Sequence, residues 1–173
     1  MLPDDRPIFL VGFMGSGKSA VGRQLADQLG WDFADTDALV ESEEGRSIER
    51  IFRESGEGSF REAEWRVLRG LEGARRLVVA TGGGLFLGLL PRQTIKRLGR
   101  TVWLDVSIET ALGRTKNGEG RPLWERDDPT AMRGFFEKRR AAYALADVRV
   151  DASRGFPEAV GALILTRLRA FLR

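Results

Sequence analysis

The stretch GFMGSGKS at residues 12–19 decides the fold. It matches the pattern G-x-x-x-x-G-K-[ST] at every fixed position, follows an apolar run at residues 8–11 and precedes a segment with apolar residues at helical spacing. Glycines let the backbone N–H groups of such a loop converge on phosphate oxygens, and the start of the next helix adds a partial positive charge. The stretch therefore predicts a strand, a phosphate-binding loop and a helix. A glycine-rich turn without a ligand is the alternative.

The loop residues have separate expected roles. The phosphates of ATP should bind the loop around Gly15, Ser16 and Gly17. Lys18 should reach the β- and γ-phosphates, and the Ser19 hydroxyl should ligate Mg²⁺. The motif indicates nucleoside triphosphate binding and leaves the phosphoryl acceptor open.

Outward from this loop, strand and helix patterns alternate. Short apolar runs predict five strands, at residues 8–11, 31–34, 77–80, 101–106 and 148–150. Helical spacing and start signals predict helices from Lys18 to Leu29, from Ser59, at 129–143 and from Pro157. This alternation is typical of an α/β fold, a parallel five-stranded sheet with helices on both faces. No linker or repeat is visible, so we expect one domain over residues 1–173.

The composition narrows the chemistry. The 173 residues include no Cys and no His, which excludes disulfides, thiolate metal sites and imidazole catalysis. No apolar run approaches the roughly 18 residues of a membrane span, and the first residues lack a signal-peptide layout, so we expect a cytoplasmic protein without membrane contact. The net charge is +3 and the basic residues are spread among acids, which argues against nucleic-acid binding.

An acidic pair, Asp35 and Asp37, stands at the end of the second predicted strand. Ligands of doubly wound sheets gather at the carboxyl ends of the strands, and residues two apart in an extended segment point the same way. Asp35 is therefore a candidate for Mg²⁺, directly or through water, and Asp37 for binding the acceptor hydroxyl and taking its proton. An Asx turn leading into a helix is the alternative.

Two further features suggest a site for an anionic polyol. Arg61, expected in the first turn of its helix and braced by Glu64, can grip a carboxylate with two parallel hydrogen bonds, although a surface ion pair would look the same. Three glycines at residues 82–84 follow a predicted buried strand, where Gly82 and Gly83 could offer backbone N–H groups to a hydroxyl. A plain strand-to-helix turn is the alternative.

Together these residues resemble the shikimate kinase family over roughly residues 8–165. The phosphate loop alone is generic, but five motifs occur in the family's order with similar spacing: GFMGSGKS at 12–19, DTD at 35–37, GE-x-x-FR-x-x-E at 56–64, TGGG at 81–84 and RPL at 121–123. The resemblance implies ATP-dependent phosphorylation of the 3-hydroxyl of shikimate with Mg²⁺, on a nucleoside-monophosphate-kinase-like fold with a mobile lid. We expect a monomer.

The resemblance also assigns residues. It implies that Asp37 and Gly83 bind the substrate hydroxyls and that two arginines bind the carboxylate. Arg61 is the first arginine. Counting back four residues from Tyr143 selects Arg139 as the second, with Arg140 as the alternative because Ala141 replaces the usual Pro. Ala20 stands where Thr is common, but it retains the backbone N–H that would face ATP.

The expected lid is the glycine-rich stretch at about residues 115–126, which has little apolar periodicity. Arg121, before Pro122, would reach the β–γ bridging region on closure and act in catalysis. Arg114 would stack on adenine. A segment after the fifth strand resembles the family's adenine loop and offers Arg154 as a weaker nucleotide contact.

Two other functions stay open at this point. A P-loop kinase for another polyol acid, such as gluconate, would share the phosphate loop but would not need the acidic pair, Arg61 and the glycine triplet together. A non-catalytic nucleotide-binding or nucleic-acid-binding module would bind without acceptor-dependent release of ADP.

Overall fold

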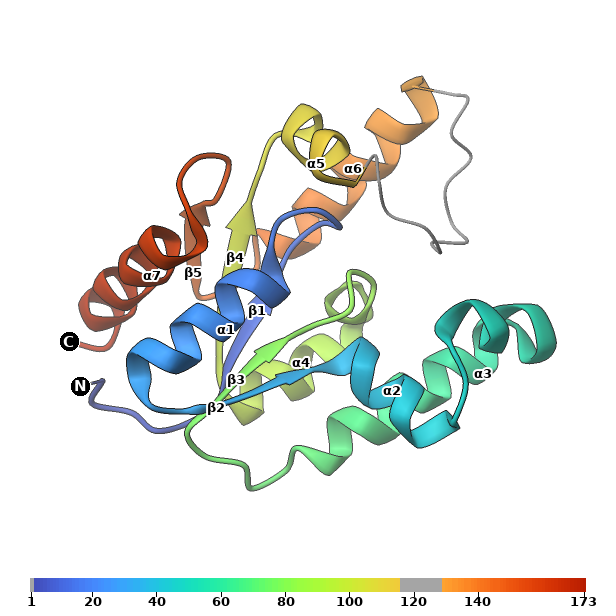
Figure 1. Ribbon diagram of the computed structural model, residues 1–173, viewed down its shortest axis with the longest axis horizontal. Helices are drawn as coiled ribbons and strands as arrows, with labels where there is room; N and C mark the ends of the chain where they lie inside the picture. The colour runs from blue at the N-terminus through green and yellow to red at the C-terminus, as the bar shows by residue number, and fades with distance from the viewer. Residues whose placement is uncertain (1, 116–128) are drawn as a thin grey trace.

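A single parallel sheet organises the chain. The computed structural model describes residues 2–115 and 129–173 (Figure 1). The sheet has the strand order β2-β3-β1-β4-β5, and every neighbouring pair is parallel. Its strands are β1 Ile8–Val11, β2 Asp32–Asp35, β3 Leu77–Ala80, β4 Arg100–Asp105 and β5 Val148–Asp151. The predicted five-stranded parallel sheet is confirmed.

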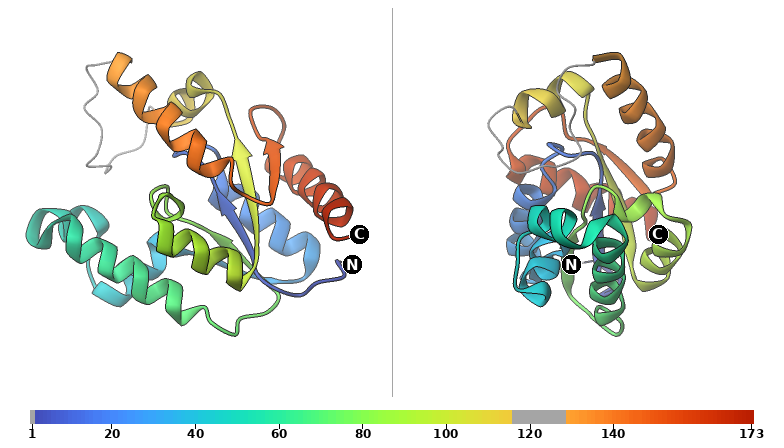
Figure 2. Two further views of the ribbon diagram at one scale, coloured as in Figure 1. Left: turned by 180° about the vertical axis from the view of Figure 1, so that it is seen from behind. Right: turned by 90° about the vertical axis from the view of Figure 1, so that its right-hand side faces the viewer.

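Helices cover both faces of this sheet, as predicted. They are α1 Lys18–Leu29, α2 Thr36–Glu44, α3 Ile48–Gly70, α4 Leu89–Leu98, α5 Ile108–Thr115, α6 Pro129–Tyr143 and α7 Pro157–Phe171, with a 3₁₀ turn, η1, at Leu85–Leu87. Helices α1 and α7 pack together on one face, and α4 and α6 lie on the other (Figure 2). Helices α2 and α3 form a pair beyond the β2 edge of the sheet (Figure 1).

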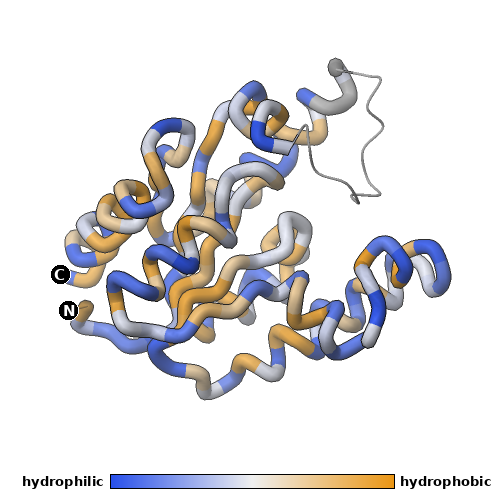
Figure 3. Tube along the Cα trace, viewed as in Figure 1, coloured by the Kyte–Doolittle hydropathy of each residue, from blue (hydrophilic) through white to orange (hydrophobic). Residues whose placement is uncertain are grey.

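The core lies at the central strands. All four residues of β1 are at most 1% exposed, and Phe86, Ile95 and Leu104 are fully buried around them. Figure 3 shows these strands as the hydrophobic centre of the chain, with hydrophilic residues concentrated on the outer helices. In the described part of the chain, no helix combines the length and apolar character needed to cross a membrane.

The start of the helix that carries Arg61 was predicted wrongly. A helix was expected to begin at Ser59, but α3 already begins at Ile48, where the Ser47 hydroxyl accepts a hydrogen bond from the Arg50 N–H at 3.3 Å. The backbone leaves the helical region at Gly56 (φ 78°, ψ 175°) and resumes immediately after it. Ser59 and Arg61 therefore lie beyond the start of the second segment, and Arg61 is not in the first turn of its helix as expected.

Other boundaries moved by one residue. Strand β2 ends at Asp35 rather than at residue 34, and β4 covers 100–105 rather than 101–106. Thr115, the first residue of the expected lid, belongs to α5. Residues 116–126, with the rest of that expected lid and Arg121, lie outside the described residues.

Candidate active site

The phosphate loop joins the end of β1 to the start of α1. Gly12, Gly15 and Gly17 have φ values of 147°, 73° and 92°, which only glycine adopts readily. A Cβ atom on Gly15 would lie 2.5 Å from the backbone oxygen of Ala111, so helix α5 packs directly on the loop. The Lys18 ammonium folds over this loop and donates to the Gly12 and Phe13 carbonyls at 2.9 and 3.0 Å.

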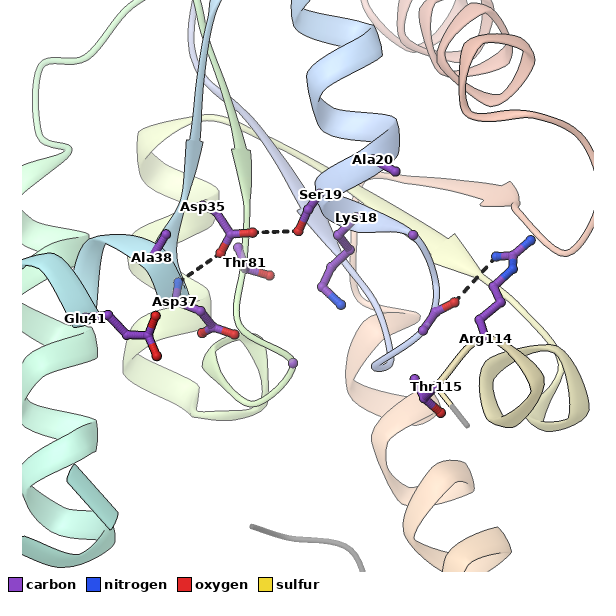
Figure 4. Close-up of a pocket in the computed structure, with 13 residues that line it drawn as sticks. Lys18, Ser19, Ala20, Asp35, Asp37, Ala38, Glu41, Thr81, Arg114 and Thr115 are labelled. Carbon is purple, nitrogen blue, oxygen red and sulfur yellow. Dashed lines mark hydrogen bonds between the residues drawn. The ribbon is translucent and has the colours of Figure 1, made fainter. Parts of the chain in front are cut away.

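The acidic pair meets the loop at Ser19. The Ser19 hydroxyl donates to Asp35 Oδ2 at 2.6 Å, and Asp35 Oδ1 accepts the Asp37 N–H at 3.0 Å (Figure 4). Asp35 is thus the N-cap of α2, as the Asx-turn interpretation expects, and it also contacts the residue after Lys18. Two such oxygens can be neighbouring ligands of Mg²⁺, because octahedral ligands about 2.0–2.1 Å from the ion lie roughly 3 Å apart.

The oxygens of Ser19 and Asp35 fit a metal ion that is also bound by phosphate, rather than one bound by protein side chains alone. Among residues 2–115 and 129–173, no cluster of three acidic side chains could hold a metal ion. Mg²⁺ usually binds through one or two protein oxygens, substrate phosphates and water.

The glycine triplet follows β3 and faces three of the predicted side chains. A Cβ on Gly82 would collide with Asp37 Oδ1, and one on Gly84 would lie 2.7 Å from Arg61 Nη1. A Cβ on Gly83 would be 3.7 Å from Arg139 Nη1. The absence of side chains on Gly82 and Gly84 therefore lets Asp37 and Arg61 approach the backbone, and Arg139 makes ordinary contact with the same short segment at Gly83.

The Gly82 N–H is already used within the protein. It donates to the Thr36 hydroxyl at 2.8 Å, in a buried hydrogen bond that ties β3 to the start of α2. Gly83, in contrast, lines the cavity beside the phosphate loop. The geometry therefore favours Gly83 over Gly82 as a ligand contact, while Gly82 gives space to Asp37.

Arg61 is held between two glutamates of its own helix. Its Nη1 donates to Glu64 Oε2 at 2.6 Å and its Nη2 to Glu57 Oε1 at 2.9 Å. Glu64 is 2% exposed, and burial raises the pKa of its carboxyl while Arg61 opposes the change. Its Oε1 is buried without a hydrogen-bond partner in the described part of the chain, which leaves an acceptor beside Gly82.

Arg139 and Arg140 point to different parts of the molecule. Arg139 is buried, its Nη1 donates to the Gly83 carbonyl at 3.3 Å, and burial lowers the pKa of its guanidinium. Its guanidinium lies 3.9 Å from the Phe135 ring centre and 6.0 Å from that of Phe13, a phosphate-loop residue. Arg140 donates to Asp105 Oδ2 at 3.1 Å. Of the two alternatives, Arg139 is the one at the triplet.

The phosphate loop, the acidic pair, Gly83 and Arg114 surround one cavity of about 440 Å³, whereas Arg61 and Arg139 lie outside its lining. Figure 4 shows Lys18 between the acidic pair on one side and Arg114 on the other. The lining of this cavity also includes Ala38 and Glu41 of α2, two residues that sequence reasoning missed. Glu41 could have been found from Asp37, because residues four apart share a helix face, had α2 been predicted.

The predicted nucleotide contacts are partly brought together. Arg114 donates to the carbonyls of Ala152 and Ser153 at 3.0 and 3.3 Å, and reaches the Gly15 and Ser16 carbonyls at 3.5 Å. It lines an adjoining cavity of about 270 Å³ together with Ser16, Gly17, Ala20, Val21, Ala152, Gly155, Phe156, Pro157 and Val160. Arg154 is exposed and does not line this cavity. Phe156, 83% exposed at its rim, was missed because it has no motif of its own.

A phosphate loop, an acidic pair next to its serine and a cavity at the same sheet edge, lined by both basic and acidic side chains, define a P-loop kinase of small molecules. A family model described as shikimate kinase matches residues 14–169. The chain belongs to the shikimate kinase family and is an ATP-dependent kinase.

Relatives and solved structures agree with this assignment. A shikimate kinase of Persephonella marina is 43% identical over 164 residues, covering 95% of this chain and 99% of the relative. The structure of shikimate kinase from Acinetobacter baumannii in complex with shikimate superimposes with a TM-score of 0.88 at 36% identity, covering 93% and 91% of the two chains. The enzyme from Aquifex aeolicus gives a TM-score of 0.85 at 39% identity, covering 95% and 96%.

Proposed function

We propose that this chain is one kinase domain that transfers the γ-phosphoryl group of ATP to the 3-hydroxyl of shikimate, giving shikimate 3-phosphate and ADP for aromatic amino acid biosynthesis. The observation that carries the proposal is the approach of Asp37, Arg139 and Arg61 to the three consecutive glycines, next to a phosphate loop. An acceptor that carries both a carboxylate and hydroxyl groups suits two cations and a carboxylate at these positions.

The proposed chemistry divides between the cavity at the phosphate loop and the neighbouring glycine triplet. Backbone N–H groups of the loop and Lys18 bind the phosphates, while Arg61 and Arg139 hold the acceptor carboxylate. The acceptor oxygen attacks the γ-phosphorus, the bond from that phosphorus to the β–γ bridging oxygen breaks, and the hydroxyl proton passes to the Asp37 carboxylate. Lys18 stabilises the negative charge on the transferring group.

Ser19 and Asp35 would hold Mg²⁺, supported by their 2.6 Å contact. When bound, the ion neutralises phosphate charge. Arg121 stays a predicted catalytic contact from outside the described residues, and Arg154 a predicted but weaker nucleotide contact. We further propose a monomer that does not bind nucleic acid. Support comes from the many arginines paired with acids on the described surface, such as Arg66 with Glu43 and Glu44. A salt-sensitive DNA complex or a stable dimer in sedimentation would contradict this.

The acceptor can be tested by coupled measurement of ADP release. We expect release that depends on shikimate, and none above background with gluconate or without an acceptor. We expect this selectivity because Arg139 stacks on Phe135, which fixes the position of its positive charge. The carboxylate of the acceptor must therefore lie at that position while a hydroxyl group reaches Asp37. Gluconate-dependent release would favour the other polyol-acid kinase, and ATP binding without acceptor-dependent release would favour a binding module.

Two adjacent arginines provide a matched pair for the carboxylate contact. Arg139→Ala should raise the KM for shikimate roughly ten- to hundredfold. This range corresponds to the loss of a hydrogen bond to a charged group, which contributes about 1.5–3 kcal/mol. Arg140→Ala removes the same side chain one residue away, but breaks a contact with Asp105, which keeps Arg149 as a partner. It should lower stability slightly and leave this KM unchanged. The opposite pattern would show that Arg140 binds the carboxylate.

A further inference from the structure

The chain's one tyrosine, Tyr143, ends helix α6 and is 1% exposed. Its hydroxyl donates to the carbonyl oxygen of Gly83 at 2.5 Å. A buried hydroxyl is costly unless it is hydrogen-bonded, so this contact fixes where the ring can lie. The family resemblance locates Arg139 four residues before Tyr143 but gives Tyr143 itself no role.

Gly83 is held by its two flanking peptide planes. The Gly82 carbonyl accepts a hydrogen bond from the Leu85 N–H at 3.2 Å, which orients the plane that carries the Gly83 N–H. The Gly83 carbonyl, held by Tyr143, orients the next plane, which carries the Gly84 N–H. Because glycine has no side chain to restrict its backbone torsions, these two carbonyl hydrogen bonds restrict them instead.

Arg139 contacts the same carbonyl, but less closely. Its Nη1 lies 3.3 Å from the Gly83 oxygen, at the long end for an N–H···O bond. Arg139 and Tyr143 are four residues apart on α6 and therefore share one helix face. The Tyr143 hydroxyl also interacts with the Arg139 side chain, but its donated hydrogen bond goes to the Gly83 carbonyl.

We propose that Tyr143 is a positioning residue for acceptor binding: its hydroxyl fixes the peptide plane between Gly83 and Gly84, and so restricts the Gly83 backbone and directs the Gly84 N–H toward the acceptor hydroxyls. The proposal rests on the proposed function. The carbonyl and N–H groups of a trans peptide point in opposite directions. Because Tyr143 holds the Gly83 oxygen toward α6, the Gly84 N–H of the same peptide points away from α6.

The phenol keeps its proton under working conditions. Burial raises the pKa of Tyr143 to about 12, although Arg139 acts in the opposite direction. Because a phenol donates only in its neutral form, the hydrogen bond to Gly83 is retained throughout the neutral and moderately alkaline range.

Tyr143→Phe keeps the buried ring and deletes the hydroxyl. We expect the KM for shikimate to rise roughly five- to tenfold, the size of effect that one lost hydrogen bond gives. The KM for ATP should stay within about twofold, since the deleted hydrogen bond goes to the glycine triplet. An unchanged KM for shikimate in an active Tyr143→Phe protein would overturn the proposal.

Thr101→Val is the matched control for a merely structural role. The Thr101 hydroxyl is also fully buried and donates to Asp147 at 2.8 Å, near the start of β4, at the opposite end of the sheet from the cavity. Urea unfolding should show that both variants lose stability, whereas only Tyr143→Phe should change the KM for shikimate. Equal changes in both variants would mean that loss of stability alone explains the effect.

A second measurement does not depend on a variant that folds. 3-Fluorotyrosine labels this chain at position 143 only, so the protein has a single ¹⁹F resonance. Saturating shikimate should shift that resonance, and ATP alone should shift it much less. A resonance that does not respond to shikimate would overturn the proposal. Wild-type protein that turns over no shikimate would instead contradict the proposed function.

Discussion

Lys18→Met is expected to abolish turnover, with a loss in kcat of about 10³-fold or more. Phosphoryl transfer has little covalent chemistry for the protein to perform, so its rate depends on positioning and on stabilising charge. Lys18 lies on the phosphate loop, where its ammonium is held by the Gly12 and Phe13 carbonyls. Methionine has similar length and volume but no charge, which isolates the electrostatic contribution.

The control is the same substitution at Lys96, on α4. Lys96 pairs with Asp147 at 3.0 Å and does not line the phosphate-loop cavity. Lys96→Met should therefore keep wild-type kcat, and thermal unfolding should show that both variants are folded. Near-normal kcat in folded Lys18→Met protein would mean that the phosphate-loop assignment is wrong.

Asp37→Asn should lower kcat by roughly 10²–10⁴-fold, the range for loss of a general base, while ATP binding survives. Asparagine keeps the shape beside Gly82 but cannot take the hydroxyl proton or accept an equally strong hydrogen bond. The measurements are steady-state kinetics with shikimate and calorimetric titration with ATP.

Asp32→Asn is the control for this second substitution, because Asp32 is exposed at the start of the same strand, β2. It should leave kcat unchanged. A variant of Asp37 that altered only the dependence on Mg²⁺ would show that Asp35 and Asp37 had been assigned each other's roles.

The predictions that succeeded depend on local pattern. The phosphate loop is a contiguous stretch with a strand before it and a helix after it, so its position needed no knowledge of distant contacts. The same holds for β3, β5 and the start of α7 at Pro157. A helix after Asp35 was given only as the alternative, an Asx turn leading into a helix, because Asp35 and Asp37 were interpreted first for their chemistry, and Asp35 does cap helix α2.

The predictions that failed or stayed open depend on tertiary structure. Ser59 satisfies a capping pattern, yet the helix is already formed there because the break occurs at Gly56. The choice between Arg139 and Arg140 is a rotation of about 100° around α6, which a count along the chain cannot decide and which the contacts with Gly83 and Asp105 distinguish. Phe156 belongs to no motif, and Tyr143 served only to locate Arg139, so the folded chain is needed to place both of them at the site.

The central place of β1 has a consequence for synthesis of the chain. This strand emerges from the ribosome before the other four described strands, but Ile8 pairs with Val78 on one side and with Arg100 on the other. A nascent chain therefore carries four apolar residues with unpaired backbone groups until most of the sequence has been made. Strands that wait for distant partners fold slowly and are prone to associate with other chains. The residues that make the best-buried strand of the finished enzyme are thus its most vulnerable segment during translation.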